Sequence, residues 1–368
     1  CCLFGTEGNA RASISGTATV QSRFFCVYVH EKYRYIMPQL SFVIPAYNAS
    51  ATITRCMDSI YNLSLTESEF EVICIDDCSK DHTIAIIEEY ARQHTNITLL
   101  CQAENQRQGA ARNRGVAIAK GKYIIFVDSD DETDKGVLEA WRLAEANKLD
   151  MVAMHYVNIN EKGDVAEKQT ITLEGVFTGI EMQTKHAYWC TGPVPYLYNA
   201  AFLQKVNYPF AEGVLFEDSD FVNVHLYYAQ KMMYCSACSY RIYYNSASTT
   251  HTISYKHMAD YLLLGTRMLR FYDSLEDQSS TYALGIKEGG CYNVWQGCRR
   301  LFKLQSPRDV VAFYDRVDSY SNPKALLQET QTPYFWDWWT KLCLRCKFVA
   351  IPLASVAILG YKLLKLIK

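Results

Sequence analysis

Short apolar runs alternate with longer amphipathic segments from residue 40 to residue 157. Apolar runs of about four to eight residues are typical of buried strands, and apolar residues three or four positions apart are typical of helices. The pattern predicts strands over 40–44, 70–75, 97–101, 123–127 and 151–157. It predicts helices over 52–63, 81–90, 109–120 and 134–147. This alternation predicts an α/β fold with a doubly wound sheet and helices on both faces.

Four residues predict where these elements begin and end. Pro45 is expected to stop the first strand, and Gly121 fits the C′ position after the third helix. Asp81 and Asp134 are expected as N-caps of the second and fourth helices.

The two ends of the chain differ from this middle part. Residues 1–36 lack the basic and apolar regions of a secretory signal, so we expect a disordered leader or a start-site artefact before a domain over 37–255. Residues 256–333 carry leucines and methionines at helical spacing and predict a helical annex.

The tail over 334–368 combines an aromatic cluster, basic residues and an uncharged apolar run over 348–361. This run is shorter than the ~20 residues of a spanning helix, and Pro352 interrupts it. Aromatic and basic flanks favour a helix lying on a membrane surface. The alternative is a C-terminal helix packed on the domain.

Composition excludes some classes of function. Lys and Arg number 37 against 39 Asp and Glu, so binding of nucleic acid through bulk positive charge is not expected. The 14 cysteines are too sparse for a disulfide-stapled domain. The pairs Cys235/Cys238 and Cys343/Cys346 lie too far apart in sequence for a zinc ribbon, and a reduced cytosolic protein is the favoured interpretation.

Polar residues follow three of the predicted strands, at 45–48, 76–79 and 128–131. Ligands of such sheets bind beyond the carboxyl ends of the strands. Asp128-Ser-Asp130 leaves an apolar strand, and its carboxylates suit Mg²⁺ or Mn²⁺ together with nucleotide phosphates. An acidic turn capping the next helix is the alternative. Asp218-Ser-Asp220 repeats this spacing, but only the first copy follows a strand.

Three further segments have both a functional and a structural interpretation. Asp76 and Asp77 either contact a base or ribose or belong to an ordinary strand–helix loop. Arg112 or Arg114 either faces a diphosphate or makes surface contacts. Glu217-Asp218 either supplies a general base or begins a helix. Because no Gly-x-Gly-x-x-Gly follows a strand and no Walker loop is present, neither a dinucleotide oxidoreductase nor a P-loop NTPase is supported.

The blocks 41–48, 75–81, 108–115, 123–131 and 217–218 resemble, in order and spacing, those of family 2 glycosyltransferases. The resemblance covers roughly residues 38–255. It implies a GT-A-type mixed sheet, here followed by the C-terminal helical extension. It also implies Mn²⁺ or Mg²⁺, a nucleotide-sugar donor such as a UDP-sugar, and inverting transfer.

The resemblance also implies roles for individual residues. The implied donor-binding residues are Pro45, Tyr47, Asn48, Asp77, Arg112, Asp128 and Ser129. Asp130, with Asp128, would hold the metal; Asp218 would be the catalytic base, and Glu217 beside it would orient acceptor or donor sugar. Asn245 stands where the family often has a basic residue. His251 is either a further metal ligand or a solvated loop residue.

These observations predict an inverting glycosyltransferase acting on a saccharide or lipid-linked saccharide in polysaccharide or glycolipid synthesis. Its expected place is cytoplasmic, attached peripherally to the inner face of a membrane. One alternative is a metal-dependent nucleotidyltransferase, although residues 45–50 are not the Gly-rich basic loop that such an enzyme normally carries. The other is a non-catalytic nucleotide-sugar-binding scaffold. The sequence leaves open the sugar, the acceptor, the linkage and the oligomeric state.

Overall fold

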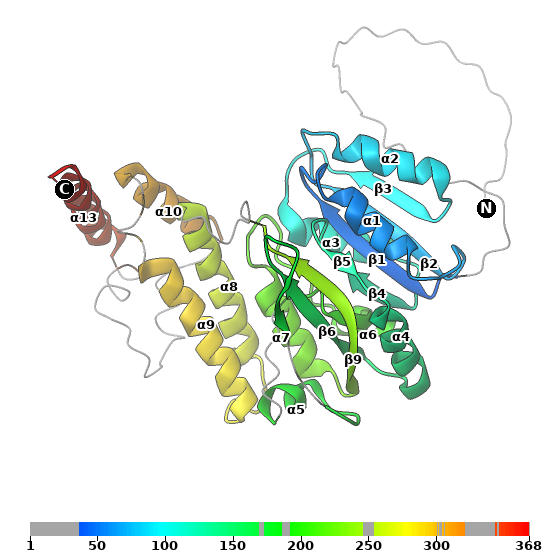
Figure 1. The fold of residues 1–368 in the computed structure, drawn as a ribbon. Coiled ribbons are helices and arrows are strands. Elements are labelled where there is room, and N and C mark those ends of the chain that lie inside the picture. Colours follow the sequence, from blue (N-terminus) through cyan, green and yellow to red (C-terminus); the bar gives the residue numbers. More distant parts are fainter. Residues whose placement is uncertain are drawn as a thin grey trace, which may run out of the picture.

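The computed structural model describes residues 37–168, 173–185, 192–245, 254–299, 301, 304, 306–320, 343 and 346–367. The predicted leader over 1–36 and the aromatic cluster over 334–339 lie outside these residues. A sheet domain forms one side of the described structure, and the C-terminal helices form the other (Figure 1).

The sheet is mixed, as the resemblance implied. Its strands are β1 (Leu40–Ala46), β2 (Phe70–Asp76), β3 (Ile97–Cys101), β4 (Tyr123–Phe126), β5 (Glu132–Thr133), β6 (Met151–Ile159), β7 (Val165–Lys168), β8 (Tyr196–Asn199) and β9 (Met232–Tyr243). The strand order is β3-β2-β1-β4-β8-β6-β9-β5, with β7 paired to β6. Strands β1 to β4 are mutually parallel, whereas β8 runs antiparallel between β4 and β6.

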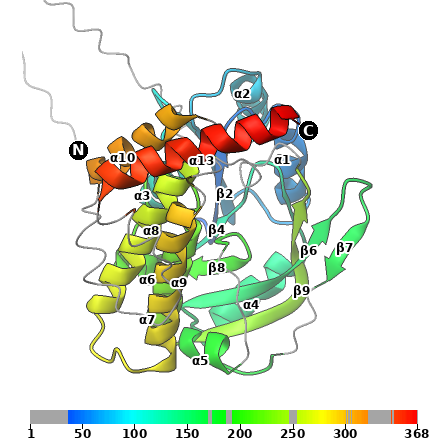
Figure 2. The ribbon, with the colours of Figure 1, turned by 90° about the vertical axis from the view of Figure 1, so that its left-hand side faces the viewer.

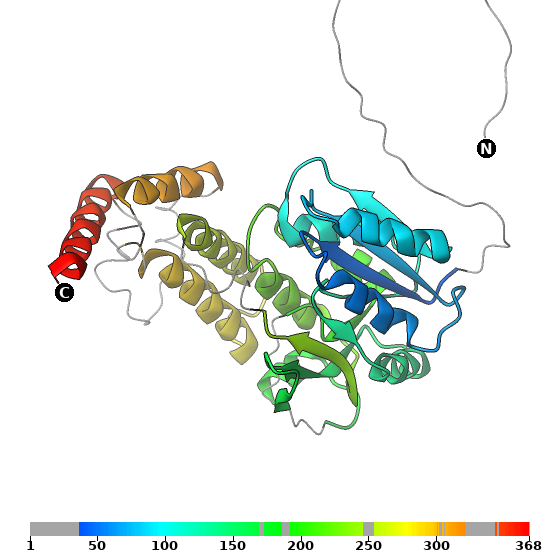
Figure 3. The same ribbon diagram turned by 45° about the horizontal axis from the view of Figure 1, so that its top comes forward.

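The helices of the sheet domain lie on both faces. They are α1 (Ile53–Tyr61), α2 (Thr83–Gln93), α3 (Arg107–Ile118), α4 (Gly136–Asn147), α5 (Gly179–Thr184), α6 (Ala200–Val206) and α7 (Asp218–Tyr228). From β1 to β3 the chain adds each new strand on the same side of the sheet, and it then crosses back to place β4 on the other side of β1. Since parallel crossovers are right-handed, this reversal places α3 on the face opposite α1 and α2 (Figure 3). The predicted α/β fold is confirmed.

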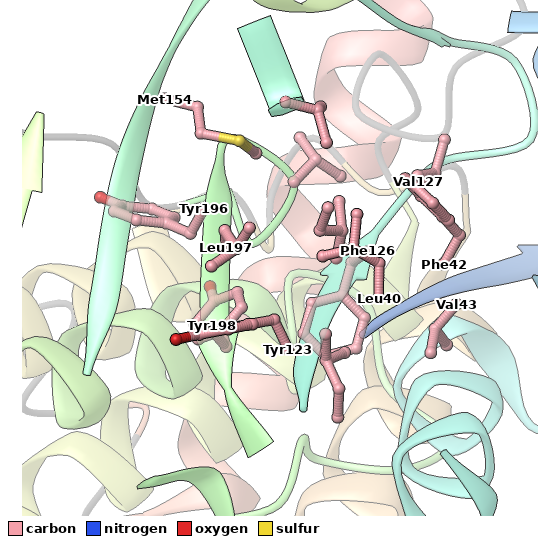
Figure 4. Close-up of a cluster of buried hydrophobic side chains, with 14 of the residues drawn as sticks. Leu40, Phe42, Val43, Tyr123, Phe126, Val127, Met154, Tyr196, Leu197 and Tyr198 are labelled. Carbon is pink, nitrogen blue, oxygen red and sulfur yellow. The ribbon is translucent and has the colours of Figure 1, made fainter. Parts of the chain in front are cut away.

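The core lies on both faces of the central strands. Phe42, Phe126 and Tyr198 are buried there, among the side chains drawn in Figure 4. Strands covered on both faces are expected to be almost wholly apolar, as β1 and β4 are. The ring of Phe126 meets Phe210 edge to face at 5.2 Å, and Phe210 stacks on Phe221 at 3.6 Å. These aromatic contacts tie the segment before α7 to the sheet.

Two predicted element ends are wrong. Strand β1 continues through Pro45, which pairs with Ile75 of β2. Pairing of β1 with β4 has already ended at Val43, so the missing N–H of proline interrupts no bond to β4. Gly121 is not a C′ residue, because α3 ends at the C-cap Ala119. A Cβ on Gly121 would lie 2.7 Å from the backbone nitrogen of Ser41, so the close approach of β1 explains this glycine.

Two predicted caps are displaced. The N-cap position of α2 is His82 rather than Asp81, although Asp81 Oδ1 still accepts the backbone N–H of Thr83 at 3.0 Å. The N-cap position of α4 is Lys135, because the carboxylate of Asp134 pairs with Arg241 of β9 at 2.7 Å. One oxygen of Asp134 is therefore engaged in a tertiary ion pair, while its other oxygen accepts the backbone N–H of Lys135 at 2.7 Å.

The C-terminal helices are α8 (Tyr255–Asp273), α9 (Thr281–Arg299), α10 (Pro307–Tyr320) and α13 (Lys347–Ile367). Helices α8 and α9 pack closely, and the Cβ position of Gly265 lies 2.6 Å from the carbonyl oxygen of Gly290. Helix α13 lies beside α10, at the side of these helices away from the sheet (Figures 1 and 2). No helix within the described residues has the length and apolar character needed to cross a membrane.

Candidate active site

The loops after β1 and β2 are joined at the carboxyl edge of the sheet. Asn48 has a left-handed backbone with φ of 49°. Its backbone N–H donates to Ser79 Oγ at 2.9 Å, and its side-chain oxygen accepts the N–H of Lys80 at 2.8 Å. Tyr47 is 48% exposed beside these bonds, whereas Pro45 is buried within β1. The paired loops therefore present an accessible aromatic ring.

Asp77 lies just below these loops and is buried. Its carboxylate accepts the backbone N–H groups of Gln106 at 2.7 Å and Arg107 at 2.8 Å, as well as the side-chain amide of Gln102. Burial raises the pKa of Asp77, and these bonds oppose that rise. Asp77 thus holds the backbone N–H groups of Gln106 and Arg107 at the start of α3.

Arg112 joins two acidic blocks that are far apart in sequence. Its guanidinium is buried between Asp128 Oδ1 at 2.7 Å and Glu217 Oε1 at 2.5 Å. Arg112 comes from α3, Asp128 follows β4, and Glu217 precedes α7. Arg114, the other candidate on α3, is exposed and donates to Gln106 at 2.8 Å. Of these two arginines, Arg112 is therefore the one that contacts the acidic blocks.

Glu217 and Asp218 bind protons more tightly than ordinary carboxyl groups. Burial raises the pKa of Glu217 to about 7, with Arg112 opposing the rise and Asp218 adding to it. Burial also raises the pKa of Asp218 to about 6, again against the attraction of Arg112. Raised carboxyl pKa values next to a fixed cation are typical of sites that move protons.

The acidic turn after β4 carries three aspartates. Asn245 donates to Asp130 Oδ2 at 2.9 Å, and Arg55 donates to the backbone oxygen of Asp130. Burial and the charge of Asp128 raise the pKa of Asp130. Burial, together with Asp128 and Asp130, raises the pKa of Asp131 well above its ordinary value. Crowding of like charges thus makes this turn favourable for a cation.

The donor atoms fit a divalent metal that completes its shell with ligand oxygens. One oxygen of Asp128 accepts from Arg112, and one oxygen of Asp130 accepts from Asn245; these two carboxylates are the groups that would hold a cation. In the part of the chain that the structure describes, no three His, Cys, Asp or Glu side chains form a metal-binding group. One or two carboxylates plus phosphates is the usual arrangement for Mg²⁺.

The second acidic pair has a different role. Asp220 is buried and accepts from Arg267 of α8 and from the hydroxyl of Tyr208 at 2.9 Å. Its carboxylate therefore joins α7 to the C-terminal helices. The assignment of the metal to Asp128-Ser-Asp130 stays a prediction.

Two contacts to the site had no local signal in the sequence. Tyr240 of β9 is buried, and its hydroxyl accepts the backbone N–H of Asp128 at 2.9 Å. The guanidinium of Arg55 lies 3.8 Å from the ring centre of Tyr243 and contacts the turn at Asp130. Ser129 is partly exposed between the two aspartates, and His251 lies outside the described residues.

Comparison with known sequences identifies the sheet domain. Residues 41–208 match the sequence model of glycosyl transferase family 2. The poly(ribitol-phosphate) beta-glucosyltransferase of Bacillus spizizenii is 35% identical over 127 residues, which are 34% of this chain and 20% of that protein. The uncharacterized glycosyltransferase EpsJ of Bacillus subtilis is 33% identical over 197 residues, 50% of this chain and 55% of that protein. The chain thus spans at most about half the length of these two relatives.

Comparison with solved structures gives the same fold. The crystal structure of Staphylococcus aureus TarS residues 1–349 with UDP-GlcNAc superposes with a TM-score of 0.59 and 19% identity. The superposition covers 88% of this chain and 91% of that one, so the similarity includes more than the sheet domain. It confirms the predicted GT-A-type α/β fold with C-terminal helices.

Proposed function

We propose that the chain is an inverting glycosyltransferase, because residues 41–208 match the sequence model of glycosyl transferase family 2. Its donor would be a nucleotide sugar, with a UDP-sugar favoured because TarS was crystallised with UDP-GlcNAc. Its acceptor would be a saccharide or a lipid-linked saccharide in polysaccharide or glycolipid synthesis. The observation that carries the proposal is Arg112, which joins Asp128 in the matched segment to Glu217 beyond it.

The donor would lie across the carboxyl ends of β1, β2 and β4. Tyr47 would stack on the base, since its ring is half exposed at this edge. Asn48 and Asp77 bond to neighbouring loops and would hold the two sides of the base pocket, and the buried Pro45 would form its wall. The donor's ribose would then lie near Asp128 and Ser129.

Asp130, together with Asp128, would hold Mn²⁺ or Mg²⁺. When bound, the metal would neutralise charge that develops on the leaving diphosphate. Arg112 would stabilise the same charge from its buried position between the two acidic blocks.

Asp218 would act as the general base. With a pKa of about 6 it is mostly ionised at neutral pH and still basic enough to take a proton from an acceptor hydroxyl. The acceptor oxygen forms its bond to the anomeric carbon while the bond from that carbon to the diphosphate oxygen breaks. The bonding electrons leave with the diphosphate, the proton goes to Asp218, and the anomeric centre is inverted.

Donor binding and transfer can be tested separately. We would measure thermal stability with nucleotides and UDP-sugars, with Mn²⁺ or EDTA, because a ligand of the native state raises its stability. A metal-dependent shift that Asp130→Ala removes supports the donor site. Asp218→Asn should keep the shift and lose transfer, while Asp273→Asn, a change at an exposed aspartate of α8, should alter neither. Wild-type transfer by Asp218→Asn would overturn the base assignment.

The same assay separates the two alternative functions. A nucleotidyltransferase would release pyrophosphate from a nucleoside triphosphate, whereas a glycosyltransferase releases UDP when an acceptor is added. A scaffold would show the binding shift without turnover of any donor. Family membership of residues 41–208 favours glycosyl transfer over both.

We further propose attachment to the cytoplasmic face of a membrane through α13. Ala350, Ala354 and Ile358 are buried in the cluster that includes Val310 and Phe313 of α10. This contact agrees with the alternative of a helix packed on the protein. Other apolar residues of α13 are exposed: Val349, Leu353, Val356 and Leu359. All charged residues in 347–368 are lysines, which suits anionic lipid.

Sedimentation with vesicles containing anionic lipid tests the attachment. The double change Leu353→Glu and Val356→Glu should release the protein from vesicles. Val311→Glu, at an exposed apolar residue of α10, should leave binding unchanged. Equal sedimentation of all three proteins would contradict a role for α13.

A further inference from the structure

We propose that Asp260 of α8 and Arg316 of α10 are positioning residues for the catalytic base. Residues 207–217, which join α6 to α7 and carry Glu217, are called the base loop below. The inference rests on the proposed function, because it assigns the C-terminal helices to the site containing Asp218.

Asp260 and Arg316 together hold two backbone groups of the base loop. Asp260 is 1% exposed, and its Oδ2 accepts the backbone N–H of Leu215 at 3.1 Å. Its Oδ1 accepts from Nε of Arg316 at 2.8 Å. Nη2 of Arg316 donates to the carbonyl oxygen of Gly213 at 2.9 Å. The bonds therefore restrain the backbone at positions two and four residues before Glu217.

A second ion pair from α8 holds both sides of the loop. Arg267 donates to the carboxylate of Asp220, two residues after the proposed base, and to the carbonyl oxygen of Pro209 at 2.9 Å. The hydroxyl of Tyr208 donates to the same carboxylate of Asp220. Helix α8 thus contacts the base loop at Pro209 and Leu215, and it contacts α7 at Asp220.

The sheet domain supplies the opposite wall. Asn113 of α3 exchanges two hydrogen bonds with the backbone of Phe210, both 3.0 Å long. The backbone N–H of Gly213 also donates to the carbonyl oxygen of Gln106 at 3.0 Å. The base loop is therefore bonded on one side by α3 and on the other by α8 and α10.

The residue between these restraints and the base has an unfavourable backbone. Phe216 has a φ of 64°, which is rare for a bulky side chain, and its ring stacks on Tyr261 of α8 at 4.5 Å. Such a conformation persists where surrounding contacts determine it. Releasing Gly213 and Leu215 would let Phe216 relax and shift Glu217 and Asp218.

This geometry indicates positioning rather than stability alone. A buried ion pair often stabilises a fold no better than apolar residues of the same volume. Its hydrogen bonds, however, have fixed directions, so they hold the bonded backbone groups in place. Catalytic groups need placement within about 0.5 Å, and a displacement of about 1 Å can lower the rate about 100-fold.

The test compares Arg316→Ala, Arg316→Lys and a control, Arg308→Ala, at an exposed arginine of the same helix. Arg316→Ala should lower kcat about 10- to 100-fold and leave the affinity for UDP with Mn²⁺ within about twofold. Arg316→Lys keeps the charge and should recover most of kcat. Arg308→Ala should match the wild type. If Arg316→Ala fails to fold, Asp260→Asn provides the same comparison at nearly unchanged volume.

Hydrogen exchange gives a readout that does not depend on turnover. Peptides covering 213–217 should exchange faster in Arg316→Ala than in the wild type or Arg308→Ala. If the wild type transfers no sugar, the proposed function fails. The exchange result still shows whether Arg316 restrains the base loop. Unchanged exchange, or a fall in kcat that only follows the folded fraction, would overturn the positioning role.

Discussion

Replacing Arg112 with methionine should destabilise the protein in a pH-dependent way. The change removes the buried guanidinium between Asp128 and Glu217 and keeps most of the apolar side-chain volume. Removing one partner of a buried ion pair typically costs about 3–5 kcal/mol, because the remaining charge is uncompensated. We expect that loss in the free energy of unfolding near pH 8.

The pH dependence follows from Glu217 and Asp218. The folded-state pKa of Glu217 is raised from 4.5 to about 7, and that of Asp218 from 3.8 to about 6. Each group therefore costs stability as the pH rises from its ordinary pKa to its raised pKa. Arg112 opposes both rises, so its removal moves both pKa values higher and extends this cost to higher pH. Each added pKa unit costs about 1.4 kcal/mol. The two proteins should therefore differ least near pH 5 and most near pH 8.

Urea unfolding at pH 5.5 and pH 8 measures this difference. With a slope of about 1–3 kcal/mol per molar urea, a loss of about 3–5 kcal/mol lowers the midpoint by about 1–5 M at pH 8. Arg114→Met on the same helix removes an exposed guanidinium and should change stability by less than about 0.5 kcal/mol at either pH. A loss for Arg112→Met that is equal at both pH values would refute the assigned coupling.

Three further predictions concern transfer, UDP binding and stability. Because the pKa of Asp218 is about 6, kcat/KM should fall about tenfold per pH unit below pH 6 and level off above pH 7. A value of kcat/KM that is unchanged at pH 5 would exclude Asp218 as the base. Tyr47→Ala should weaken UDP binding about tenfold in a titration, whereas Tyr47→Phe keeps the stacking ring and should bind like the wild type. Gly109→Ala would place a Cβ 2.3 Å from the carbonyl oxygen of Ala211, so we expect a loss of about 1–3 kcal/mol and slower transfer. Gly192→Ala, where a Cβ meets no described atom within 4 Å, is its control.

Strand positions and the family resemblance could be predicted because their signals are local. The predicted strand over 97–101 matches β3, and the acidic blocks after β2 and β4 were located from the apolar runs before them. The helix predicted after Glu217-Asp218 is α7. Buried parallel strands need continuous apolar residues, so this signal survives in the sequence.

The roles of individual polar side chains could not be predicted in the same way. Asp134 has the residue type of an N-cap but pairs with Arg241, and Asp77 accepts the backbone of α3. Asp218-Ser-Asp220 and Asp128-Ser-Asp130 have the same spacing, but their carboxylates bond to different partners: Asp128 to Arg112, and Asp220 to Arg267. A carboxylate takes whichever donors the fold brings within reach, and those donors come from distant parts of the chain.

The sequence by itself therefore determined the α/β alternation, the edge of the sheet that carries polar residues and the family resemblance, because each depends on neighbouring residues. Only the tertiary structure decided that Arg112 lies between Asp128 and Glu217, and that Asp260 and Arg316 hold the loop before Asp218. These contacts join residues 16 to 105 positions apart, for which local propensity carries no information. Their geometry follows from how the sheet and the C-terminal helices pack.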